Sequence, residues 1–80
     1  MSNNKKILEA FSEALQVEAD IIHDALMYQS IPEWDSISHM VLITELEDVF
    51  DISIDTDDVI DMSSFAKAKE IISKHKITFD

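Results

Sequence analysis

The sequence predicts an all-α protein, a small four-helix bundle with three longer helices, one short helix and a long first loop. Three observations predict it. The 80 residues include no glycine and one proline, so the tight glycine turns of β-hairpins are absent. Apolar residues recur at steps of three and four, which is the spacing of one helix face. Short polar residues that can cap helices precede these segments. We expect one domain spanning residues 1–80.

The first helix is expected over roughly residues 4–16, and a long loop follows it. Residues 16–34 carry apolar side chains without helical or strand period, which predicts an ordered loop with a short helical turn near residues 20–25. A loop of this length in a compact domain is usually functional. Trp34 is expected to anchor its end by packing. The apolar face of the first helix comprises Ile7, Leu8, Phe11, Ala14 and Leu15.

The second helix is expected from about Ser36 to Phe50, because the short side chains of Asp35 and Ser36 can accept hydrogen bonds from first-turn N–H groups. Val41 lies off the main apolar stripe, as either a boundary core residue or a contact for a partner. The expected buried face comprises Ile37, Met40, Leu42, Ile43, Leu46, Val49 and Phe50. The expected acidic outer side comprises Glu45, Glu47, Asp48 and Asp51.

The remaining residues predict a short and a longer helix. Residues 51–58 alternate between apolar and polar, but they have no second strand to pair with, so we expect an extended connector. Asp55 or Thr56 is expected to cap a short third helix that ends near residue 61. Ser63 or Ser64 is expected to cap a fourth helix that ends near residue 75, followed by a tail that folds back. The buried face of the fourth helix comprises Phe65, Ala68, Ile71 and Ile72.

The charge distribution restricts the partners. The formal net charge is -11, and no basic side chain stands between Lys6 and Lys67. Binding to nucleic acid or anionic lipid requires positive charge, so neither is expected. No apolar run reaches the length of a membrane span, and a cytoplasmic monomer without membrane insertion is expected. With no cysteine, any thiol chemistry has to come from an attached group.

Other functional interpretations of the sequence fit less well. Asp35, Ser36 and His39 suggest a hydrolase, but no glycine-rich nucleophile turn is present, so catalysis is not expected and His39 is interpreted as a surface residue. The segment from Asp51 fails as a calcium loop, because it lacks the glycine and the final glutamate, so no metal site is expected. The three methionines of the middle of the chain are expected in the core: Met27, Met40 and Met62.

The chain resembles the acyl carrier protein family over nearly its whole length. The resemblance lies in Asp35-Ser36-Ile37, Leu42, Leu46-Glu47, Phe50-Asp51-Ile52 and Ser63-Ser64-Phe65. It implies that Ser36 carries 4′-phosphopantetheine, attached by a phosphopantetheinyl transferase, and that Asp35 belongs to the motif. It also implies that enzymes with basic patches dock on the second helix, through positions matching Ile37, Val41, Thr44, Glu45, Glu47 and Asp48.

Two departures from the family pattern bear on the pathway. Ile37 replaces the usual leucine, and Glu33-Trp34 stands where a glycine commonly precedes the motif. Housekeeping fatty-acid carriers usually have that glycine, and the Trp-Asp-Ser form resembles free-standing carriers of specialised pathways more closely. The resemblance as a whole implies a role in fatty-acid, polyketide or related specialised biosynthesis. Two alternatives stay open. The cargo can be an aminoacyl or peptidyl group loaded by an adenylating enzyme, or the protein can be an unmodified acidic interaction module in which Ser36 is only a cap.

Overall fold

The computed structural model describes residues 3–79 and shows an all-helical bundle, as the sequence predicts. Its helices are α1 (Asn3–Leu15), α2 (Ser36–Phe50), α3 (Thr56–Asp61) and α4 (Phe65–Ser73), and one 3₁₀ turn, Ala19–Ile21, lies in the long loop. The helical turn expected near residues 20–25 is therefore shorter and earlier. No strand is present between residues 3 and 79; Met27 and Ser64 form a single isolated bridge.

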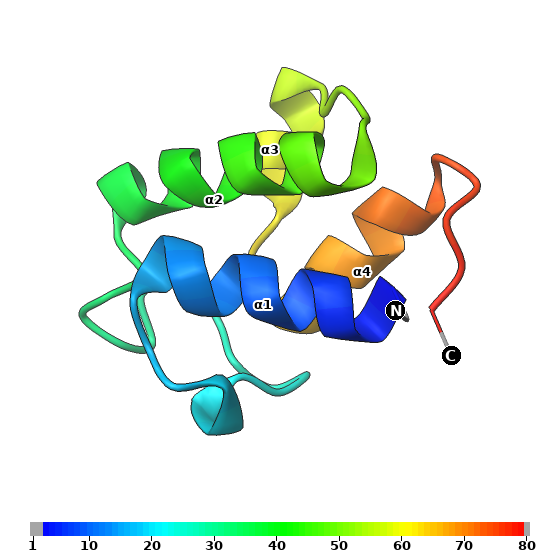
Figure 1. Cartoon of the computed structure of the whole chain (residues 1–80). Helices are drawn as coiled ribbons and strands as arrows, with labels where there is room; N and C mark the ends of the chain where they lie inside the picture. The colour runs from blue at the N-terminus through cyan, green and yellow to red at the C-terminus, as the bar shows by residue number, and fades with distance from the viewer. Residues whose placement is uncertain (1–2, 80) are drawn as a thin grey trace.

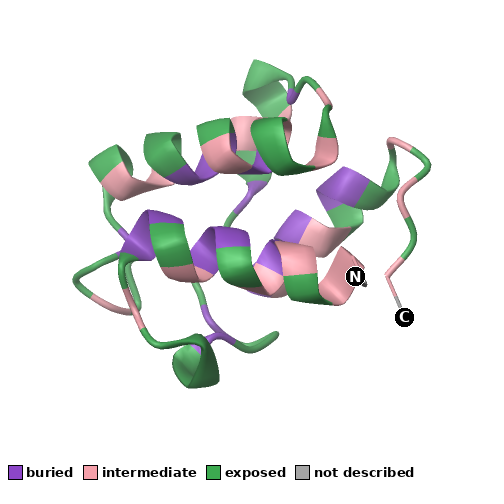
Figure 2. Ribbon diagram, in the orientation of Figure 1, coloured by how far each residue is buried: buried purple, intermediate pink, exposed green. Residues whose placement is uncertain are grey.

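Helices α1 and α2 lie side by side and antiparallel (Figure 1). The two ends of the described chain meet, because the Asn3 side-chain amide donates to the Thr78 carbonyl at 2.9 Å. The buried residues of the three longer helices face one another across one hydrophobic core (Figure 2). Phe11 of α1 packs edge-on against Phe65 of α4, with ring centroids 4.8 Å apart. The four expected core residues of α4 are all buried, which confirms that face.

The buried face of α2 differs from the expected one. Leu42, Ile43 and Leu46 are buried, but Ile37 is 76% exposed and Met40 is 57% exposed. Helix α2 carries apolar residues on more than one side. Two different sets of these residues have the spacing of a buried helix face, and packing against α1 decides which set is buried. Val49 and Met27 are also exposed, so the expectation that they belong to the core was wrong; Met62 is buried as expected.

The long loop is fixed to the segment that joins α3 to α4. The Tyr28 backbone N–H donates to the Ser63 carbonyl at 2.9 Å, and the Phe65 N–H donates to the Leu26 carbonyl at 3.0 Å. Leu26 and Ile22 bury their side chains in the core. The loop is therefore an ordered part of the bundle, and it delivers Trp34 and Asp35 to the start of α2.

Left-handed backbone at four non-glycine residues makes the sharp turns of this glycine-free chain. Gln16, Gln29, Asp51 and Lys76 have φ between 54° and 66°, a region that favours glycine and tolerates asparagine and aspartate. Asp51 alone among the four is of a residue type that this region tolerates well. Asp51 ends α2, and the next N–H, of Ile52, donates back to the Glu47 carbonyl at 3.1 Å.

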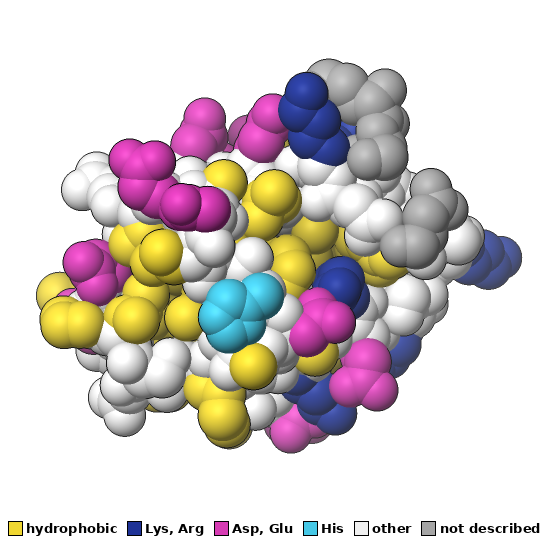
Figure 3. Space-filling model, turned by 90° about the horizontal axis from the view of Figure 1, so that it is seen from below, with side chains coloured by type: hydrophobic (Ala, Val, Ile, Leu, Met, Phe, Trp, Pro, Cys, Tyr) yellow, Lys and Arg dark blue, Asp and Glu magenta, His cyan; other side chains and the backbone are white. Residues whose placement is uncertain are grey.

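Positive and negative side chains are unevenly placed on the surface. Figure 3 views the molecule from below: the visible lysine side chains gather in one half, and the other half shows acidic and hydrophobic side chains. The lysine-poor half lies at the end of the molecule where α1 finishes (Figure 1), and α2 lies on the far face, which this view does not show.

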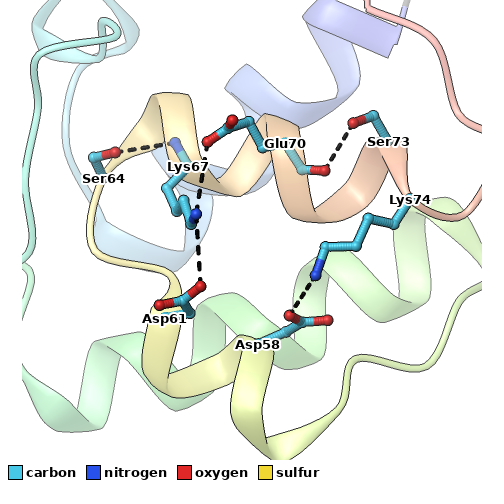
Figure 4. Close-up of polar contacts among 7 residues, drawn as sticks. All are labelled: Asp58, Asp61, Ser64, Lys67, Glu70, Ser73 and Lys74. Carbon is cyan, nitrogen blue, oxygen red and sulfur yellow. Dashed lines mark hydrogen bonds and ion pairs between the residues drawn. The ribbon is translucent and has the colours of Figure 1, made fainter.

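Ion pairs to two lysines hold the short helix α3, which has no buried residue of its own. The Lys74 ammonium donates to Asp58 at 2.7 Å, and the Lys67 ammonium lies 3.6 Å from Asp61 (Figure 4). The hydrogen bond to Asp58 raises the pKa of Lys74. Ser64 caps α4 by accepting the Lys67 N–H at 3.0 Å, as predicted. Lys67 of α4 and Lys74 at its C-cap thus pair with two carboxylates of α3, Asp61 and Asp58.

Candidate functional site

Ser36 is the first residue of α2 and is exposed at its tip, as expected. Asp35 precedes it in extended backbone and caps the helix, because its Oδ1 accepts the Ser38 N–H at 2.9 Å. This hydrogen bond lowers the pKa of Asp35, so the carboxylate is held in its charged, accepting form. The first N–H groups of a helix have no intrahelical partner, and they favour an anion such as a phosphate group.

The buried side chain of Trp34 anchors this tip. Trp34 is 0% exposed and packs edge-on against Phe11 and Tyr28, with centroid distances of 5.4 and 6.1 Å. Its backbone N–H donates to the Ile31 carbonyl at 3.2 Å. The position of Ser36, two residues later, is therefore set by the aromatic core.

His39 is not the surface residue that the sequence predicted. It is partly buried, and its Nδ1 accepts the Trp34 indole N–H at 3.0 Å. Because an indole N–H only donates, Nδ1 carries no proton and Nε2 does, so Nε2 donates to the Val59 carbonyl of α3 at 2.8 Å. The ring thus joins the loop, α2 and α3. Both nitrogens have partners other than Ser36, so the site does not offer the serine–histidine pair that nucleophilic catalysis needs.

The surface around Ser36 is apolar on α2. Ile37 and Met40 are exposed as described above, Val41 is 48% exposed and Thr44 is exposed. Val41 is therefore a surface residue, which favours the partner-contact interpretation over the boundary-core one. Among residues 3–79, no group of three or more His, Cys, Asp or Glu side chains could hold a metal ion.

The carboxylates of α2 have different surroundings. The Glu47 Oε2 accepts the Ile54 N–H at 2.8 Å, so Glu47 helps to hold the connector before α3. Glu45 is partly buried beside Glu13 of α1, whereas Asp48 is exposed. Desolvation, and then the charge of Glu13, raise the pKa of Glu45, with a smaller contribution from Asp48.

We expect Glu45→Gln to stabilise the fold at neutral pH. A raised pKa in the folded state means that the charged form is disfavoured there, so Glu45 destabilises the fold above that pKa and ceases to do so as the pH falls through it. The free energy of unfolding should rise by roughly a few tenths of a kcal/mol, because solvent screens most of the repulsion between Glu45 and Glu13. Urea unfolding of variant and parent at pH 7 and near pH 4 measures it. The gain should shrink at the lower pH, and a gain that grows there would contradict the assignment.

Comparison with known proteins agrees with this geometry. A bundle of four helices that presents an exposed serine at the tip of its second helix is the architecture of a small carrier domain. A curated acyl carrier protein from Lactobacillus johnsonii is 32% identical over 71 residues, which cover 89% of this chain and 89% of that protein. The chain therefore belongs to the acyl carrier protein family. No protein-family model matches the chain, and no solved structure gives a significant match.

None of the helices within residues 3–79 combines the length and the apolar character that crossing a membrane demands.

Proposed function

We propose that this protein carries acyl intermediates on a 4′-phosphopantetheine group attached to Ser36. The observation that carries the proposal is the exposed serine at the start of α2 in a member of the acyl carrier protein family. When attached, the group supplies a terminal thiol on which acyl groups are held as thioesters. This suits a chain whose own sequence contains no cysteine.

The residues at the tip fit a phosphodiester. Ser36 supplies an accessible hydroxyl oxygen, and the following helix supplies a positive dipole end. Asp35 accepts the Ser38 N–H and fixes the first turn, so that the hydroxyl stays at the surface. In the attachment step the Ser36 oxygen bonds to the phosphorus of coenzyme A that bears pantetheine, and the bond from that phosphorus to the bridging oxygen of the diphosphate breaks. Adenosine 3′,5′-bisphosphate leaves, and the hydroxyl proton is released to the transferase.

The partners we propose are a phosphopantetheinyl transferase and the enzymes that load and transfer the acyl group. Exposed apolar residues beside Ser36 provide contacts for them, and the carboxylates of α2 set their orientation. Ion pairs of this exposed kind are weak and give fast, reversible docking, which a carrier that serves several enzymes requires. The pathway can be fatty-acid, polyketide or related biosynthesis. An aminoacyl cargo is the alternative within carriers.

The experiment is loading of the purified protein with coenzyme A and a broad-specificity phosphopantetheinyl transferase. Intact-mass spectrometry should show a gain of one phosphopantetheinyl group, and a thiol reagent should detect one new free thiol in this cysteine-free chain. A carrier of known competence, loaded in parallel, is the control. If the control loads and this protein gains no mass, the proposal is wrong and the unmodified interaction module is favoured.

A further inference from the structure

The orientation of the Ser36 hydroxyl depends on the two residues that precede it. Ser36 is exposed at the first position of α2, and within residues 3–79 no hydrogen bond holds its side chain. Trp34 and Asp35 join the long loop to the helix, so they decide in which direction the first side chain of the helix points. Whatever holds these two residues therefore also holds the hydroxyl.

The backbone on both sides of this junction is fixed by hydrogen bonds. The Gln29 N–H donates to the Trp34 carbonyl at 3.1 Å, which ties Trp34 to the loop. The His39 N–H donates to the Asp35 carbonyl at 2.9 Å, which is the first bond of the helix. The loop and the helix are thus each ordered, and the angle between them is set where a side chain crosses the junction.

The ring of His39 crosses the junction. Its Nδ1 accepts the Trp34 indole N–H at 3.0 Å, and the planes of the two rings are 26° apart with centroids separated by 6.1 Å. Tyr28 of the loop contacts the ring of His39 at a centroid distance of 5.2 Å. His39 therefore spans Ser36: from three positions after the serine it holds the side chain two positions before it.

Helix α3 fixes the other edge of the His39 ring. Val59 lies in the last turn of α3, where carbonyl groups have no partner within the helix, and its carbonyl accepts the Nε2–H at 2.8 Å. A proton on Nε2 leaves Nδ1 as the acceptor that the indole N–H needs. The two bonds therefore support each other and hold the ring in one orientation.

We propose that His39 is a positioning residue for the attachment of phosphopantetheine to Ser36. By holding the Trp34 indole, it keeps the first turn of α2 in the orientation in which the serine oxygen reaches the phosphorus of coenzyme A. This inference rests on the proposed function, and the bonds formed and broken are those given there. Both ring nitrogens are engaged elsewhere, so His39 takes no proton from the serine and acts only through Trp34.

Positioning and docking affect different kinetic constants. The ring nitrogens of the partly buried His39 face Trp34 and Val59, so a change at His39 leaves the exposed side chains of α2 unaltered. A misplaced nucleophile slows the bond-forming step even when the complex with the enzyme forms normally. Loss of the positioning bond should therefore lower the rate constant at saturation and leave the half-saturating concentration nearly unchanged.

Two substitutions at His39 separate its two ring hydrogen bonds. In His39→Asn the amide oxygen takes the place of Nδ1 and accepts the indole N–H, but no group reaches Val59. In His39→Gln the amide nitrogen takes the place of Nε2 and donates to the Val59 carbonyl, but the indole N–H loses its acceptor. His75→Gln is the matched control, because it makes the same change in another partly buried histidine, beyond the end of α4.

Single-turnover loading, with coenzyme A saturating and a broad-specificity transferase in excess, measures the attachment step. His39→Gln should lower the rate constant at saturation about three- to tenfold, with the half-saturating transferase concentration within about twofold of the parent. His39→Asn and His75→Gln should load at the parental rate to within about twofold. The measurements are made at a temperature where circular dichroism shows every variant folded.

Nuclear magnetic resonance of the unloaded protein gives a readout that does not depend on the transferase. Trp34 is the one tryptophan of the sequence, so its indole N–H gives a single signal. That signal should keep its parental chemical shift in His39→Asn and move in His39→Gln. Hydrogen exchange at the Ser38 N–H, which Asp35 accepts, should become faster in the variant whose indole signal moves.

Equal loading rates in two His39 variants whose indole signals differ would overturn the inference, because a role in stability alone affects both variants. A change confined to the half-saturating concentration would overturn it as well, since that result indicates docking. Parental loading of His39→Gln defeats the inference alone. Failure of the parent protein to load, beside a control carrier that does load, defeats the proposed function and the inference with it.

Discussion

Ser36→Ala is expected to abolish loading by coenzyme A and a phosphopantetheinyl transferase completely. The new phosphodiester forms on the serine oxygen, and alanine has no atom that can take its place. Ser38→Ala is the matched control: it removes a second hydroxyl from the same turn, and the Ser38 N–H that Asp35 accepts is a backbone group that survives the change. Intact-mass spectrometry should show one added group on the Ser38→Ala variant and none on Ser36→Ala.

The loss of loading should occur without loss of the fold. Ser36 is exposed, and Asp35 rather than Ser36 caps α2, so the substitution should change the free energy of unfolding by less than about 0.5 kcal/mol. Circular dichroism and thermal unfolding should therefore match the parent. Loading that persists in Ser36→Ala would place the attachment elsewhere and contradict the proposal. Preserved partner binding in an unloadable Ser36→Asn variant would favour the unmodified interaction module.

The helix starts were predicted correctly from the sequence because they depend on neighbouring residues, whereas the burial of Trp34 and of the α4 face follows from their apolar character. The bounds of α2 follow from Asp35 and Ser36 at one end and from the break in apolar spacing after Phe50 at the other. The cap of α4 follows in the same way from Ser64. At the two helix starts the signal is a short polar side chain within three residues of the N–H that it accepts, so no knowledge of the tertiary fold is needed.

The features missed depend on contacts between distant segments. Ile37 and Met40 satisfy the helical spacing as well as Leu42 and Ile43, and only the position of α1 decides which pair is buried. The partial burial of His39, which the sequence predicts to be a surface residue, has no local signal of this kind. Its acceptor role is set by Trp34, five residues earlier, and its donor role by Val59, 20 residues later. The one hint in the sequence is the spacing of five residues between the indole of Trp34, just before the cap of α2, and the imidazole of His39.

Trp34→Ala is expected to unfold a large fraction of the protein. Removing a fully buried tryptophan costs about 3–5 kcal/mol, whereas a chain of 80 residues has a total stability of roughly 4–12 kcal/mol. Trp34 contacts Phe11, Tyr28 and His39, so the loss falls on the junction of loop, α1 and α2. Urea unfolding followed by circular dichroism measures it. Ile60→Ala is the control, because Ile60 is 78% exposed and its truncation should cost less than about 0.5 kcal/mol.

Trp34→Phe separates the hydrogen bond from the packing. Phenylalanine keeps most of the buried apolar surface but leaves Nδ1 of His39 without its donor, which should cost about 1–2 kcal/mol. If the indole–imidazole bond carries this cost, Trp34→Phe and His39→Ala should be non-additive, with a coupling of roughly 0.5–1.5 kcal/mol in a double-mutant cycle. If the two changes in the free energy of unfolding simply add, the indole–imidazole hydrogen bond does not carry this cost. Because His39 also donates to the Val59 carbonyl, His39→Ala should speed hydrogen exchange in α3, whose own residues are not buried.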